Sequence, residues 1–212
     1  MKRYMPVVLL ALFAFVVAQA GATNLIQNGS FQSGTFADWT IGTTSNGTWG
    51  AGFPVVTGWP LGGMNSAEGQ VGEANFDGTQ QGGTLTQSFV SSGGAATVSL
   101  DWLASAPFAG NADGGEFTIL LNGTQIAQID SGSINQGQMI NGVLMANANL
   151  KAGANTLEID VTRRFISVAN LTPLQYVTGV DVEGSVPEPG SIILMGSGVL
   201  GLAGVLRRKI GF

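Results

Sequence analysis

From residue 23 to residue 184 the chain alternates short apolar and polar runs, which are separated by turn residues. No stretch there repeats its apolar residues with the period near 3.6 that an amphipathic helix requires. The pattern favours strands, and the segment is long enough for one domain with a substantial core. We therefore expect an all-β fold, an antiparallel jelly-roll β-sandwich over residues 23–184.

The clearest local signal is a hairpin, in which Asn122-Gly123 separates Glu116–Leu121 from Thr124–Asp130. Both central residues of a type I′ turn need a positive φ, which Asn and Gly tolerate. Alternation predicts further strands at 84–90, 97–103, 156–162 and 176–182, the last with Tyr176, Thr178, Val180 and Val182 on one side. Asn141-Gly142 predicts a bulge or a turn between 139 and 145. The Gly-rich stretch 42–69 predicts long loops with one or two short strands.

Residues 1–22 have the three parts of a secretory signal peptide. Lys2 and Arg3 form the positive region, 6–17 the apolar core, and cleavage is expected after Ala20 or Ala22. The Sec translocon and signal peptidase are the implied partners. A retained N-terminal anchor is the alternative.

The C-terminal segment 185–212 combines a short motif, an apolar run and a basic stop. Residues 192–206 are fifteen residues without a charge, a helix of about 22 Å, which is short of the hydrocarbon core of a bilayer. Arg207, Arg208 and Lys209 follow directly and favour the cytoplasmic side. We expect a transmembrane helix that anchors the chain for a time, with a buried or amphipathic helix as the alternative.

Pro187-Glu188-Pro189-Gly190, the apolar run and the basic stop resemble the PEP-CTERM sorting signal of Gram-negative bacteria. The resemblance implies recognition and cleavage by an exosortase-type membrane transpeptidase, followed by release to the cell surface or the extracellular matrix. It also implies co-occurrence with extracellular polysaccharide. Tails of this kind share the label of an ice-binding-protein C-terminus, which gives no reason to infer ice binding.

The composition of the body excludes several classes of function. The whole chain has no Cys and no His, so thiolate sites, His-based zinc sites and Ser-His-Asp chemistry are excluded. Three cations against twelve acids give residues 23–184 a net charge of −9. A domain this acidic repels nucleic acid, which we do not expect as a partner.

The opening residues 24–31 resemble the first strand of galactose-binding-like jelly-roll domains of the carbohydrate-binding-module type, and the resemblance extends to 85–89, 117–123 and 154–157. In that family the last strand often carries an Asp-Asn pair that helps hold a structural Ca²⁺. Here Thr178-Gly179 takes that place and Asp181 comes two residues late. The resemblance therefore leaves Asp181 as a weak Ca²⁺ candidate and implies no other cofactor.

Catalysis would have to rest on paired carboxylates, as in glycoside hydrolases. The available pairs are Glu68 with Glu73 and Asp101 with Glu116. Carboxylates on loops and strand faces are more often simply solvated. We do not expect an enzyme, and a weak glycoside hydrolase is the remote alternative.

Trp49, Phe53 and Trp59 are the candidates for a glycan platform, because rings in Gly-rich loops can stack on sugars. More often such rings form a hydrophobic plug beneath a loop. Trp39 and Trp102 are expected in the core. Arg163-Arg164 could bind the carboxylates of an acidic polysaccharide, or be a solvated turn that pairs with Glu158 or Asp160.

The sequence thus predicts an exported, non-catalytic surface or matrix protein with a β-sandwich that binds carbohydrate. The alternative is a purely structural or adhesive surface protein that binds no glycan.

Overall fold

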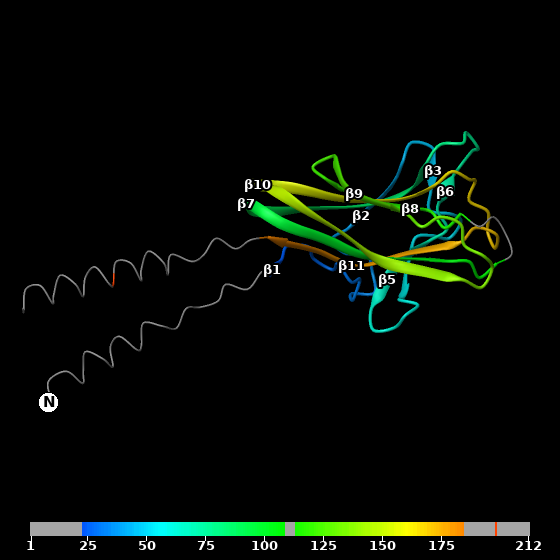
Figure 1. Ribbon diagram of the computed structural model, residues 1–212, viewed down its shortest axis with the longest axis horizontal. Coiled ribbons are helices and arrows are strands. Elements are labelled where there is room, and N and C mark those ends of the chain that lie inside the picture. The colour runs from blue at the N-terminus through cyan, green and yellow to red at the C-terminus, as the bar shows by residue number, and fades with distance from the viewer. Residues whose placement is uncertain (1–22, 109–112, 185–197, 199–212) are drawn as a thin grey trace, which may run out of the picture. The chain divides into compact units, whose positions relative to one another are not determined.

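The computed structural model describes residues 23–108, 113–184 and 198. Residues 23–108 and 113–184 form an all-β domain with eleven strands (Figure 1). The strands are β1 (Thr23–Asn24), β2 (Thr40–Thr43), β3 (Gly47–Thr48), β4 (Val55–Gly58), β5 (Asn65–Gly69), β6 (Gly72–Glu73), β7 (Gln81–Ser105), β8 (Glu116–Leu121), β9 (Thr124–Asp130), β10 (Met139–Arg163) and β11 (Leu174–Gly184). Every long pairing is antiparallel. The expected all-β sandwich is confirmed.

The sandwich is organised by β7 and β10, which pair with each other over their whole length. Both strands run to one end of the domain and fold back there (Figure 1), at Gly93-Gly94 in β7 and Lys151–Gly153 in β10. The ribbon therefore contributes to two layers. Layer one contains β4, β5, β11, residues 95–105 of β7 and residues 139–150 of β10. Layer two contains β2, residues 81–92 of β7, residues 151–163 of β10, β8 and β9.

The main core lies between the layers and contains the residues that alternation points inward. Val98, Leu100 and Trp102 of layer one, and Leu85, Leu157 and Ile159 of layer two, are all buried. Trp39 and Trp102 belong to the same core, as expected. Trp39 stacks on Phe31 with ring centroids 5.9 Å apart. Burial of these side chains is the main source of the domain's stability.

The hairpin prediction is confirmed in detail. β8 and β9 flank Asn122 and Gly123, whose φ values are +53° and +77°. Asn122 also accepts a hydrogen bond from the backbone N–H of Thr156 at 3.1 Å, which ties the turn to β10.

Four local predictions are wrong. Asn141-Gly142 lies inside the uninterrupted strand β10 and forms neither a bulge nor a turn. Of residues 24–31, only Asn24 is in a strand; Gln87 of β7 bonds the backbone of Gln27 at 2.8 and 2.9 Å, and residues 29–30 form a turn. Residues 42–69 contain four strands or parts of strands.

The fourth wrong prediction concerns β11, where the pairing with β7 shifts between Thr178 and Asp181. Val177, Val180 and Val182 therefore face the main core, whereas Tyr176 packs in a separate cluster on the other side. Gly179 absorbs the irregularity with φ of +57°. Tyr176 and Val180 are thus not on one side.

Candidate functional site

Trp49 is buried, so its predicted exposure in a glycan platform is wrong. Only 4% of its surface is accessible. A Cβ placed on Gly83 would lie 2.0 Å from its ring, and one on Gly69 would lie 2.6 Å from it. The indole Nε1 donates a hydrogen bond to the carbonyl of Gly42 at 2.8 Å. The glycines of this region therefore make room for the ring beneath the loops.

Trp59 is also buried, and its exposure as part of a platform is wrong for a different reason. It covers the outer face of layer one, in a small cluster with Leu103 and Tyr176. Its ring meets that of Tyr176 edge to face at 6.4 Å. Burial raises the pKa of Glu68, which is hydrogen-bonded to Tyr176. The pKa of Tyr176 is raised as well, first by its own burial and then by the charge and the hydrogen bond of Glu68.

Phe53 is half-buried and packs against the main core. Two of the three rings of the predicted platform are therefore buried and the third is half-buried, so they form no exposed platform. The alternative, a hydrophobic plug beneath the loops, describes Trp49 and Phe53.

The exposed rings lie elsewhere, around a cleft of about 310 Å³. We call it the Arg163 cleft; its lining comes from the segment before β7 and from the β10–β11 connection. The residues that line it are Phe76, Arg163, Phe165, Ile166, Val168, Leu171 and Thr172. Phe76 is 66% exposed and Leu171 50%. Exposed apolar side chains concentrated in one hollow indicate a binding surface.

Arg163 lies at the base of this cleft and is only 1% exposed. Its Nε lies 4.0 Å from a carboxylate oxygen of Asp113, and an Nη donates to the carbonyl of Val71 at 3.5 Å. The guanidinium also lies over the ring of Phe165, 5.4 Å from its centroid. Burial lowers the pKa of Arg163, and Asp113 opposes that shift. The guanidinium nevertheless stays protonated and has more donors than these long contacts use.

The expected partners of the Arg pair are wrong. Arg163 faces Asp113 and does not pair with Glu158 or Asp160. Arg164, which directly follows the end of β10, is exposed. A buried arginine was not foreseeable from the sequence, but Phe165-Ile166 directly after the pair, and Phe76 in a polar run, were available signals for an apolar surface.

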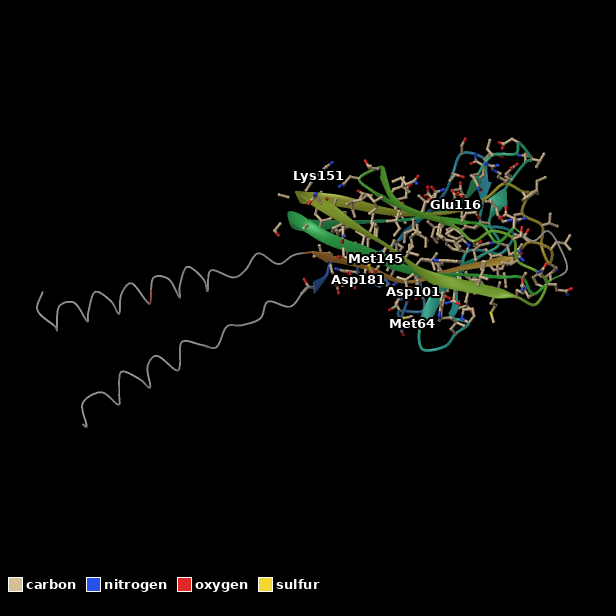
Figure 2. All side chains as sticks on the ribbon, viewed as in Figure 1. Met64, Asp101, Glu116, Met145, Lys151 and Asp181 are labelled. Carbon is tan, nitrogen blue, oxygen red and sulfur yellow. The ribbon has the colours of Figure 1, made fainter. Side chains whose placement is uncertain are left out.

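The predicted carboxylate pairs are not brought together. Glu68 bonds Tyr176, whereas Glu73 is buried and accepts a hydrogen bond from the backbone N–H of Asp77. Asp101 and Glu116 lie well apart on the sandwich (Figure 2). Instead, Glu158 and Asp160 lie two residues apart on β10 and interact with each other. Burial first, and then the charge of Glu158, raises the pKa of Asp160 to about 7.

Asp181, the Ca²⁺ candidate, lies on β11 just after the bulge. Burial and the neighbouring Glu183 raise its pKa. Within residues 23–108 and 113–184, no three Asp or Glu side chains come together in a group that could hold a metal ion.

The targeting segments lie outside the described residues, apart from Gly198. This applies to the cleavage positions Ala20 and Ala22, to Pro187, Glu188, Pro189 and Gly190, and to Arg207, Arg208 and Lys209. In the part of the chain that is described, no helix is long and apolar enough to cross a membrane.

Residues 185–209 match the family model of the PEP-CTERM protein-sorting motif. The chain carries a PEP-CTERM sorting motif. The motif implies export, and processing by an exosortase at the membrane on the way to the cell surface.

Carbohydrate-binding modules are among the solved structures that resemble the sandwich. The structure of TmCBM61 in complex with β-1,4-galactotriose has a TM-score of 0.48 at 11% identity, covering 76% of this chain and 98% of that one. The CBM22-1 xylan-binding domain from Paenibacillus barcinonensis Xyn10C has a TM-score of 0.42 at 13% identity, covering 78% and 97%. The arabinose-bound α-L-arabinofuranosidase MgGH51 has a TM-score of 0.42 at 18% identity; the match covers 78% of this chain but 27% of the enzyme. A comparison with curated protein sequences finds no match.

Proposed function

We propose that this PEP-CTERM protein is a non-catalytic protein of the cell surface or extracellular matrix, and that its sandwich binds carbohydrate in the Arg163 cleft. The observation that carries the proposal is the combination of exposed apolar side chains with a buried guanidinium beneath them. The C–H faces of a sugar ring pack on aromatic and aliphatic side chains. The guanidinium of Arg163 is only 1% exposed, so it favours a sugar that carries a carboxylate through its positive charge beneath the cleft.

In this proposal the Sec translocon exports the chain and signal peptidase removes residues 1–22. The apolar run 192–206 then holds the chain in the inner membrane until an exosortase-type transpeptidase cleaves near Pro187-Glu188-Pro189. The motif at residues 185–209 supports this route. Mass spectrometry of the exported protein tests it: loss of residues after the motif is expected, and a mature form that ends at Phe212 would contradict it.

A glycan array of neutral and uronic-acid oligosaccharides tests the cleft. We expect wild-type protein to bind at least one of them, and Phe76→Ala and Leu171→Ala to weaken binding about tenfold each. Val90→Ala is the matched control, because Val90 is 75% exposed and does not line the cleft. Failure of wild type to bind any glycan, or equal binding by all three variants, would reject the cleft as a sugar site.

The non-catalytic part of the proposal rests on the carboxyl groups. Neither predicted pair is assembled, and Glu158 and Asp160 lie two residues apart on one strand, so they cannot flank a substrate from two sides. Release of reducing sugar from any bound oligosaccharide would overturn it.

A further inference from the structure

Layer one ends in a strand edge that no other strand covers. Residues 139–149 of β10 pair with β7 on one side only. Within residues 23–108 and 113–184, no strand pairs with their other side; β8 joins β10 only from Leu157 onward. Along this edge Val143 and Met145 are each 61% exposed, and Met139 is 51% exposed. We call residues 139–149 the β10 edge.

The β10 edge lacks the devices by which sheet edges avoid association. It contains no charged residue and no proline, and its pairing with β7 has no bulge. The other edge strands differ from it. β2 and β4 have four residues each, and the β8–β9 pairing contains an irregularity at Ile119 and ends at Asp130. A long, regular, apolar edge with free backbone groups is a template for another strand.

Electrostatics restrict where two copies of this chain can meet. Residues 23–184 have a net charge of −9, so most surfaces of two copies repel each other. The stretch from Ser131 to Leu150 is twenty residues long and has no charge. Two copies can therefore approach along this stretch with the least repulsion.

The edge is also complementary to itself in one antiparallel register. With a two-fold axis through Leu144, Val143 lies opposite Met145 of the second copy, and Asn141 lies opposite Asn147. All four side chains are exposed in the single chain. Apolar residues thus face apolar ones and amides face amides, which are favourable cross-strand pairs.

We propose that a second copy of this chain pairs antiparallel with the β10 edge, so that layer one of the two copies becomes one continuous sheet. The interface is isologous, because the same eleven residues contribute from both sides. The Arg163 cleft takes no part in it, so the proposal stands or falls independently of carbohydrate binding.

Sedimentation velocity of the full chain in mild detergent tests association over a concentration series up to about 100 μM. We expect wild type to dimerise, and Val143→Glu to weaken the dimer about tenfold or more, because it places two carboxylates close to the two-fold axis, each opposite Met145 of the other copy. Val90→Glu is the control of equal charge and comparable exposure, and should leave the dimer unchanged. A wild type that stays monomeric, or equal weakening by both variants, would overturn the proposal.

Disulfide trapping tests the register, and the chain has no cysteine of its own to interfere. Directly opposed strand residues have the Cα separation that a disulfide requires. Mixing Val143→Cys with Met145→Cys should therefore give a cross-linked dimer faster than either variant alone, and mixing Asn141→Cys with Asn147→Cys should do the same. Fastest cross-linking in a mixture of Val143→Cys with Asn147→Cys would show another register and overturn the one proposed.

Discussion

Two groups of large apolar side chains occur in the irregular segments of this domain, and one group is buried whereas the other is exposed. Trp49 and Trp59 lie in the Gly-rich stretch and are 4% and 8% exposed. Phe76 lies before β7 and Phe165 lies in the β10–β11 connection, and they are 66% and 39% exposed. The difference shows that glycines can make space for a ring, as Gly69 and Gly83 do for Trp49, as well as form flexible loops. A buried ring should determine stability, and an exposed one should determine binding.

The largest expected effect is the loss of Trp49. Trp49→Ala leaves a cavity over Gly69 and Gly83 and removes the hydrogen bond to Gly42, so we expect a loss of about 3–5 kcal/mol in the free energy of unfolding. Trp49→Phe should lose less. Chemical denaturation measures both, and glycan binding by the folded fraction should match wild type. Reduced binding by folded Trp49→Phe would break the comparison.

Gly83→Ala should have the next largest effect, because its Cβ would lie 2.0 Å from the Trp49 ring. We expect a destabilisation of about 1–3 kcal/mol from overpacking. Gly58→Ala is the matched control in β4, where a Cβ meets nothing within 4 Å. In the Trp49→Ala background the cost of Gly83→Ala should fall, since the ring it strikes is gone. Additive effects of the two substitutions would contradict this contact.

Local signals explain how much of the molecule was predictable. The Asn122-Gly123 turn and the inward alternation of Val98, Leu100 and Trp102 depend on neighbours in sequence, and both predictions are confirmed. The position of Trp49 depends on Gly83, which is thirty-four residues away along the chain. The facing of Tyr176 depends on a bulge that forms only when β11 pairs with β7. No sequence window contains both partners of such contacts.

The candidate site was harder to predict for the same reason. Arg163-Arg164 was singled out as a basic pair, but nothing near it in the sequence shows that Arg163, the last residue of β10, is buried, or that Phe76 from a distant segment lines the same cleft. The sorting motif at residues 185–209 is the opposite case. It is contiguous, so its residues could be recognised without any knowledge of the fold.

The comparison of buried with exposed groups extends to carboxylates. Burial raises the pKa of Asp160 to about 7, whereas hydrogen bonds from Thr79 and Asn46 lower the pKa of the exposed Asp77. An unfolded Asp titrates near 3.9. Between about pH 4 and 7 Asp160 is therefore protonated in the folded state but ionised in the unfolded state. The stability that this proton contributes is present below pH 4 and is lost as the pH rises through 7.

Asp160→Asn should remove this dependence and stabilise the domain at pH 8 relative to wild type, by about 1–2 kcal/mol after allowance for solvent screening. This corresponds to a rise in Tm of about 2–8 °C. Thermal melts from pH 4 to 8 measure it, and the difference between variant and wild type should shrink toward pH 4. Asp77→Asn is the control and should not reproduce the gain at pH 8. A difference for Asp160→Asn that is constant with pH would contradict the raised pKa.

The smallest expected effect on stability is that of Phe76→Ala. With two thirds of its surface already in water, the ring loses little burial, and we expect a change of about 0.5 kcal/mol or less in the free energy of unfolding. Its effect on glycan binding should be large, which is the reverse of what is expected for Trp49. Chemical denaturation and the glycan array, applied to the same protein preparations, measure both quantities. A strongly destabilised Phe76→Ala would show that the ring supports the fold, and the distinction between buried stabilising rings and exposed binding rings would then fail.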